Sequence, residues 1–226
     1  MYRIVFLLQF LFLIGGIVYT GGKTVPTSVS IIVSVSFLVM AIIQWMRDKS
    51  IYAKIVIFVA GIYLVGNLVL ADLLPLGFMI GMGIYFVAQA ATILCFVKTA
   101  KELKKPFINR FFIVGMIIYS IIVVIAWWVF FEPSKNTELL IFIALIYGFW
   151  LSAMAASGLS LYYIDRRYIF SAIGGFVFLV SDFVAGISDI AGKDVPYKVN
   201  IVWITYVIAI GCIIYGKNLL VDRKKS

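Results

Sequence analysis

Long apolar segments, separated by short polar stretches, run through the whole chain. A transmembrane helix needs about 20 mainly apolar residues to cross the hydrocarbon core of a bilayer. The sequence has eight runs of about that length, which predict helices at 4–20, 26–46, 51–74, 76–98, 107–131, 138–163, 168–190 and 199–220. We therefore expect an all-α membrane protein, with eight transmembrane helices in one bundle.

The composition agrees with this pattern. Hydrophobic residues make up 64% of the 226 residues and charged residues 13%, whereas a soluble domain is about half apolar and about a quarter charged. The connections between the runs leave no room for a soluble domain, so residues 1–226 are expected to form a single integral membrane domain. The first run follows Arg3 as in a signal peptide, but it lacks a clear cleavage site and is expected to remain a helix.

The placement of the basic residues predicts the orientation in the membrane. The net charge is +9. If the N-terminus is cytoplasmic, only Lys23, Lys135, Lys193 and Lys198 of the 19 basic residues fall on outer segments. The other fifteen fall on inner segments, and they are Arg3, Arg47, Lys49, Lys54, Lys98, Lys101, Lys104, Lys105, Arg110, Arg166, Arg167, Lys217, Arg223, Lys224 and Lys225. The positive-inside rule thus predicts cytoplasmic N- and C-termini in a cell membrane. The charge reflects topology and lipid contact, so we expect no nucleic-acid partner.

Two parts of the chain look alike. The segment 64–69 aligns without gaps with the segment 179–184, which places Asn67 opposite Asp182. A similar offset aligns Cys95 with Cys212. This pattern indicates a parallel duplication of a four-helix unit, because an even number of spans returns the chain to the same side. Chance similarity between apolar segments is the alternative.

Asp182 is the main candidate for chemistry. A charged side chain near the middle of a span costs roughly 2.5–3.5 kcal/mol on insertion scales, and such residues usually mark functional sites. Counted along their predicted helices, Asn67 and Asp182 lie at similar depths in the outer half of the bilayer. Gln89, Tyr147, Trp203 and Tyr206 can reach the same region from descending helices. We therefore expect these side chains to converge on a pocket that opens toward the outer leaflet.

Most of these polar residues also have a structural interpretation. Asn67 and Gln89 can form hydrogen bonds between helices, which are worth about 0.6–2 kcal/mol, and the tyrosines can pack as ordinary aromatic residues. Asp72 and Asp189 lie near helix ends where water is available, so we favour a structural role for both. Asp182 has no comparable structural use.

Several kinds of site are excluded. Ser181 adjoins Asp182, but the chain has no histidine, so a serine hydrolase dyad and the usual zinc sites are not expected. Cys95 and Cys212 lie in apolar runs and are interpreted as small buried hydrophobic residues. No span has a lysine near its centre, which argues against retinal. We expect neither a metal nor a cofactor.

Three groups of residues carry a resemblance to a known family. The first is Gly174-Gly175-Phe176 through Ser181-Asp182, followed by Trp203 and Tyr206. The second is Gly66-Asn67 with the segment from Gly81 to Gln89, and the third is Tyr147 with Met154-Ala155-Ala156. Over about residues 55–216 the chain resembles the YhhN-like family of eight-span membrane proteins, which includes the lysoplasmalogenases. The resemblance implies hydrolysis of the vinyl-ether bond of lysoplasmalogens, with release of a fatty aldehyde. It also implies acid catalysis by two intramembrane aspartates, in which a proton is added to carbon and water captures the resulting oxocarbenium ion.

The chain departs from the family pattern at two positions. Asn67 stands where the first aspartate is expected, and Gln89 stands where a histidine is expected. Of the two catalytic carboxylates, only Asp182 is present. The resemblance therefore predicts a reaction centre at Asp182 and Asn67, with the substrate bound by Gln89, Tyr147, Ser181, Trp203 and Tyr206.

Three functions stay open from the sequence. The first is the hydrolase, with a lipid or lysophospholipid substrate. The second is a binding protein for lipid or another amphiphile that performs no catalysis. The third is a proton-coupled transporter, since an intramembrane carboxylate and a repeated architecture also suit that role. The sequence makes no prediction about the oligomeric state.

Overall fold

The computed structural model of the protein describes residues 1–131 and 139–219. The described residues contain no strand, and their eight α-helices are α1 (Tyr2–Tyr19), α2 (Thr27–Arg47), α3 (Ile51–Leu70), α4 (Phe78–Glu102), α5 (Arg110–Phe131), α6 (Leu139–Ile164), α7 (Ile169–Asp189) and α8 (Lys198–Tyr215). Short 3₁₀ turns, η1 (Arg166–Tyr168) and η2 (Gly216–Leu219), precede α7 and follow α8. All eight helices are long and apolar enough to span a membrane, as predicted. Lys135, Arg223, Lys224 and Lys225, which entered the prediction of orientation, lie outside the described residues.

The predicted end of the third helix was wrong. We expected the helix to continue to residue 74, but α3 ends at Leu70 and Asp72 takes a left-handed conformation, with φ of 55°. The Asp72 N–H bonds to the carbonyl of Val69, and the N–H of the next residue bonds to Leu68. This pair of bonds is a Schellman motif, which closes a helix by satisfying its last carbonyls. The apolar residues after Leu70 therefore form a loop, and their hydropathy alone did not reveal it.

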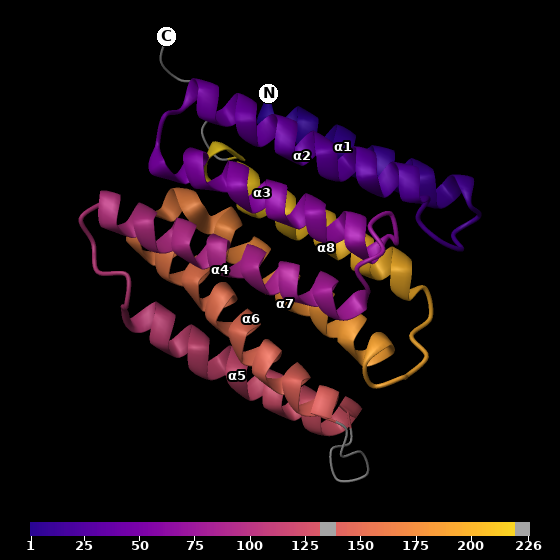
Figure 1. Ribbon diagram of the computed structural model, residues 1–226. Coiled ribbons are helices and arrows are strands. Elements are labelled where there is room, and N and C mark those ends of the chain that lie inside the picture. Colours follow the sequence, from indigo (N-terminus) through magenta and orange to yellow (C-terminus); the bar gives the residue numbers. More distant parts are fainter. Residues whose placement is uncertain (132–138, 220–226) are drawn as a thin grey trace.

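The helices form a layered bundle (Figure 1). The pair α1 and α2 lies on one side and α5 on the other, with α3, α4, α6, α7 and α8 between them. Helices that follow one another mostly pack as antiparallel neighbours, as in α3 with α4 and α7 with α8. Contacts of α4 with α6 and of α2 with α8 close the bundle around its interior. The helices α1 and α5 bury the smallest share of their residues, in keeping with their place at the two sides.

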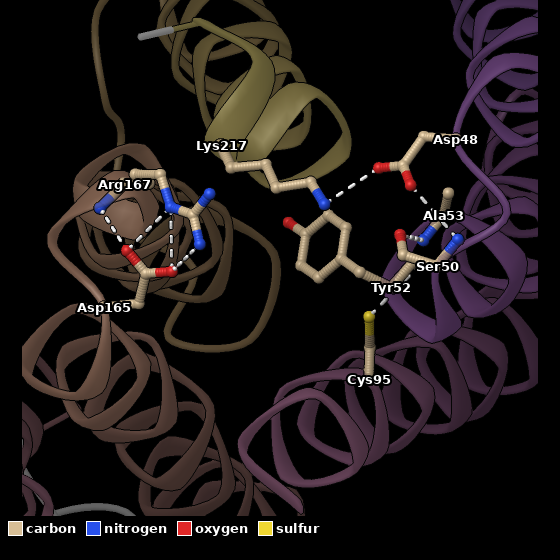
Figure 2. Close-up of polar contacts among 8 residues, drawn as sticks. All are labelled: Asp48, Ser50, Tyr52, Ala53, Cys95, Asp165, Arg167 and Lys217. Atoms are coloured by element: carbon tan, nitrogen blue, oxygen red, sulfur yellow. Dashed lines mark hydrogen bonds and ion pairs between the residues drawn. The ribbon is translucent and has the colours of Figure 1, made fainter. Parts of the chain in front are cut away.

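Both ends of the described chain lie at the same end of the bundle, which we call the terminal end. The Arg3 side chain there donates a hydrogen bond of 2.5 Å to the carbonyl of Leu219. An ion pair of 2.9 Å joins Lys217 to Asp48, and a second pair joins Arg167 to Asp165 across 2.6 Å. Figure 2 shows these two ion pairs in one close-up, with the Tyr52 ring drawn beside Lys217.

Two adjacent glycines hold α7 tightly between its neighbours. A Cβ atom on Gly174 would lie 2.7 Å from the carbonyl oxygen of Ala209 in α8, and one on Gly175 would lie 2.9 Å from the Cα atom of Ala155 in α6. Side chains larger than hydrogen do not fit at these backbone contacts, and small residues are how membrane helices approach closely. The glycines thus fix α7 from both sides, two turns before Asp182.

Candidate functional site

A pocket of about 470 Å³ opens at the end of the bundle opposite the terminal end. It is lined by the first turns of α2, α4 and α8, by the last turns of α3, α5 and α7, and by part of α6. Since these helix ends alternate along the chain, they all lie at this opposite end, which we call the pocket end. The volume falls within the range of about 300–1,000 Å³ that is usual for ligand sites.

Asp182 lies on the pocket wall and forms a cluster with two other side chains. The Tyr147 hydroxyl donates a hydrogen bond of 2.6 Å to its Oδ2 atom, and Gln89 Nε2 donates one of 3.0 Å to the same atom. Gln89 Nε2 also lies 2.6 Å from the Tyr147 oxygen. Among the described residues, no hydrogen bond ends on Oδ1 and no cation pairs with Asp182. The protein therefore holds the carboxyl group through Oδ2 alone in the described part of the chain.

Gln89 stands behind this cluster and is not part of the pocket wall. Its side chain is fully buried, and its Oε1 atom has no hydrogen-bond partner in the described part of the chain. A buried acceptor without a hydrogen-bond partner costs about 1–3 kcal/mol. We predicted Gln89 to bind substrate. That role stays a prediction, and in the structure the side chain donates hydrogen bonds to Asp182 and Tyr147.

Asn67 forms a second cluster on the wall of the same pocket. Its Nδ2 atom donates hydrogen bonds of 2.8 Å to the hydroxyl oxygens of Ser34 and Tyr206, and its Oδ1 atom accepts one from Tyr85. Both amide hydrogens are therefore used, and one acceptor position on Oδ1 remains. No hydrogen bond among the described residues joins Asn67 to Asp182, although the two side chains share the pocket.

Three other predicted residues also lie on the pocket wall, namely Ser181, Trp203 and Tyr206. The Ser181 hydroxyl donates a hydrogen bond of 3.1 Å to the carbonyl of Val202, so it ties α7 to α8. The rings of Trp203 and Tyr206 meet edge to face with 5.4 Å between their centroids. The structure thus brings six of the seven predicted site residues to one pocket, with Gln89 as the seventh behind it.

Several members of the site were not predicted from the sequence. Tyr85 and Ser34 hold Asn67, yet nothing in their helices distinguished them from packing residues. Asp189, for which we favoured a structural role, forms an ion pair with Lys198 and also lines the pocket, which was not predicted. Its position seven residues after Asp182 was a usable signal, because residues seven apart share one face of a helix.

The described residues show no group of three or more histidine, cysteine, aspartate or glutamate side chains that could hold a metal ion. Cys95 and Cys212 are buried, and neither is in a disulfide.

The sequence model of the YhhN family matches residues 28–216. This match covers seven of the eight helices, including every helix that lines the pocket. Comparisons with curated proteins and with solved structures found no match.

Proposed function

The chain belongs to the YhhN family of multi-pass membrane proteins, and we propose that it hydrolyses the vinyl-ether bond of lysoplasmalogens within the membrane. The observation that carries this proposal is the Asp182 carboxyl group on the wall of a pocket among apolar helices. Tyr147 and Gln89 hold its Oδ2 atom, and Oδ1 has no protein partner in the described residues. With both termini cytoplasmic, as the basic residues predict, the pocket opens toward the outer leaflet.

The reaction begins when Asp182 transfers a proton from Oδ1 to the outer carbon of the vinyl ether, the one that continues into the alkyl chain. The double bond supplies the electron pair for the new C–H bond, and the ether oxygen shares the positive charge as an oxocarbenium ion. The Asp182 carboxylate then lies beside this cation and stabilises it. Hydrogen bonds from Tyr147 and Gln89 to Oδ2 orient the carboxyl group for this transfer.

Water completes the reaction. It adds to the oxocarbenium carbon and returns a proton to Asp182, which gives a hemiacetal and restores the acid. The hemiacetal then breaks its C–O bond to the glycerol oxygen, which takes a proton, and the products are a fatty aldehyde and a glycerophospho-base. Asp182 gives a proton to the vinyl ether and takes one back from the attacking water. The reaction therefore balances without a cofactor.

Asn67 acts in this scheme as a positioning residue. An amide does not deliver a proton at neutral pH, and both N–H groups of Asn67 already bond to Ser34 and Tyr206. Its network holds the phenol groups of Tyr85 and Tyr206 on the pocket wall. The proposed role for Asn67 is to fix the shape of the pocket opposite Asp182.

Purified protein in detergent or nanodiscs tests this proposal with a lysoplasmalogen in D₂O. We expect aldehyde release, with one deuterium on the carbon next to the aldehyde group when the product is reduced at once. The matched control is the saturated ether analogue, which has no double bond to protonate and should release nothing. Failure of the native protein to release aldehyde at any pH from 5 to 8 would exclude the hydrolase.

A second candidate function is the binding of lysolipids without turnover. The observation that favours it is the amide at Asn67, which stands where the family pattern has an aspartate and has both N–H groups in use. In this case the native protein binds the vinyl-ether lipid and its saturated analogue equally well, and no aldehyde forms with either.

A further inference from the structure

The wall of the pocket has two chemically different sides. The parts of α4, α5 and α6 that line it are mainly apolar and include Met82, Val123, Trp127, Phe131 and Leu151. The rest of the wall, from residues 24–30, α7 and α8, has the charged side chains of Asp182, Asp189 and Lys198 and the hydroxyl groups of Thr24, Thr27, Ser30, Ser181 and Tyr206. Tyr85 and Tyr147 add hydroxyl groups from α4 and α6. A ligand that matches both sides is an amphiphile, with its chain toward α5 and its head group toward α2 and α8.

The polar side contains an ion pair at the mouth of the pocket. Asp189 is the last residue of α7 and Lys198 is the first residue of α8, and Lys198 Nζ is in direct contact with Asp189 Oδ1. The two side chains are 32% and 26% exposed, so both charges are reachable from outside while they line the pocket. Apart from Asp182, they are the charged side chains among the described residues of the wall.

The register of α7 sets the distance between this ion pair and the acid. Asp189 follows Asp182 by seven residues, which places it about 20° around the helix and about 10.5 Å along it. In a lysoplasmalogen, seven bonds separate the carbon that receives the proton from the phosphorus atom. An extended chain of that length spans about 9 Å, at the roughly 1.2–1.3 Å per bond that standard bond lengths and angles give. One lysoplasmalogen molecule is therefore long enough to place its phosphate at the ion pair and its vinyl ether at Asp182.

We propose that Lys198 and Asp189 form the head-group subsite of the pocket, in which Lys198 binds the phosphate of a lysophospholipid and Asp189 binds the ammonium group of a zwitterionic head group. This inference rests on the proposed function for the identity of the lipid, but it concerns binding and not turnover. The ion pair between the two residues is exchanged for two ion pairs with the ligand, so a zwitterionic head group leaves no charge unpaired. Charge-assisted hydrogen bonds to phosphate give Lys198 the larger share of the affinity.

Binding of non-hydrolysable lipids tests the subsite, followed by fluorescence of Trp127 and Trp203 on the pocket wall. The probes are 1-O-hexadecyl-glycerophosphoethanolamine, the same lipid with a bare phosphate, and 1-O-hexadecylglycerol without phosphate. Glycerophosphoethanolamine serves as the head group without a chain, and we expect it to bind at least about a hundredfold more weakly than the whole lipid.

The two single variants should act in opposite directions on the bare phosphate lipid. Lys198→Gln should weaken its binding about tenfold, because the cation is lost. Asp189→Asn should strengthen it several-fold, because a competing anion is removed from Lys198. Both variants should weaken the ethanolamine lipid and leave hexadecylglycerol unchanged.

Parallel effects of the two variants on all three lipids would show that the ion pair only holds α7 to α8, and the subsite would be wrong. Hexadecylglycerol binding as tightly as the phosphate lipids would overturn it as well. If the proposed hydrolysis is wrong and the subsite is right, the native protein releases no aldehyde. Its lipid binding then still depends on the phosphate and on Lys198.

Discussion

The Tyr147 hydroxyl donates a hydrogen bond of 2.6 Å to Oδ2 of Asp182, which links α6 to α7 at the wall of the pocket. Tyr147→Phe removes this bond and leaves the ring in place. A hydrogen bond to a charged group is worth about 1.5–3 kcal/mol, and Asp182 becomes a charged carboxylate as it gives up its proton. We therefore expect kcat for aldehyde release to fall about tenfold or more, with a smaller change in KM.

Tyr119→Phe is the control for this variant. Tyr119 is a buried tyrosine of α5 whose hydroxyl forms no hydrogen bond among the described residues, and it does not line the pocket. The substitution should leave kcat within about twofold of the native value. Equal losses in the two variants would mean that the Tyr147 hydroxyl has no special role in the reaction.

Asn67→Asp tests whether the second carboxyl group of the family pattern can be restored. The side chain is surrounded by the hydroxyl groups of Ser34, Tyr85 and Tyr206, which can each donate to a carboxylate oxygen. The network can therefore hold an aspartate. We expect aldehyde release to rise about tenfold or more above the native rate. A folded variant that binds lipid and shows no rise would mean that a carboxyl group at this position does not take part in the reaction.

Gly175→Ala tests the close packing of α7 on α6. The added Cβ atom would lie 2.9 Å from the Cα atom of Ala155, which is backbone and cannot turn aside. Overpacking of this kind costs about 1–3 kcal/mol. Thermal unfolding in detergent should show a clear loss of stability. Gly61→Ala is the matched control, because no atom lies within 4 Å of a Cβ atom there, and it should be neutral or slightly stabilising.

The ion pair of Asp165 and Arg167 at the terminal end predicts a pH dependence of stability. Hydrogen bonds from Arg167 hold the pKa of the Asp165 carboxyl group below its usual value. A lowered pKa in the folded state stabilises the fold above the unfolded pKa of about 3.9, and this contribution is lost as the pH falls through the folded value. Arg167 is 58% exposed, so solvent screening keeps the contribution below about 1 kcal/mol.

Asp165→Asn should therefore lower the unfolding temperature slightly at pH 7, and the difference from the native protein should shrink as the pH falls below about 4. Asp194→Asn, at an exposed loop residue, should have no effect at either pH. A difference for Asp165→Asn that stays the same at all pH values would show that the charge of Asp165 does not matter.

The sequence predicted the spans and much of the pocket because both follow from simple physical limits. A bilayer requires about 20 apolar residues per helix, so the eight runs stand out, and a lone acid within one of them attracts attention to Asp182. Helix ends were predicted less well. The end of α3 depends on the left-handed turn at Asp72, which an apolar sequence does not signal.

The hydrogen-bond partners in the site needed the structure. Tyr85 and Ser34 bond to Asn67 because α2, α3 and α4 place them at one point, and no spacing along the chain encodes this. Lys198 follows Asp182 by sixteen residues, and the α7–α8 hairpin brings it to the same pocket. Parallel duplication of a four-helix unit, and the orientation in the membrane, stay predictions.

The most direct measurement of the central claim compares aldehyde release and lipid binding in the native protein and in Asp182→Asn. Asparagine keeps the size of the side chain but cannot deliver a proton, and general acid catalysis contributes about 10²–10⁴-fold to rates. We expect Asp182→Asn to lower kcat at least about a hundredfold, while the saturated ether lipid still binds with an affinity within a few-fold of native. Native rates of aldehyde release in this variant would show that Asp182 is not the catalytic acid.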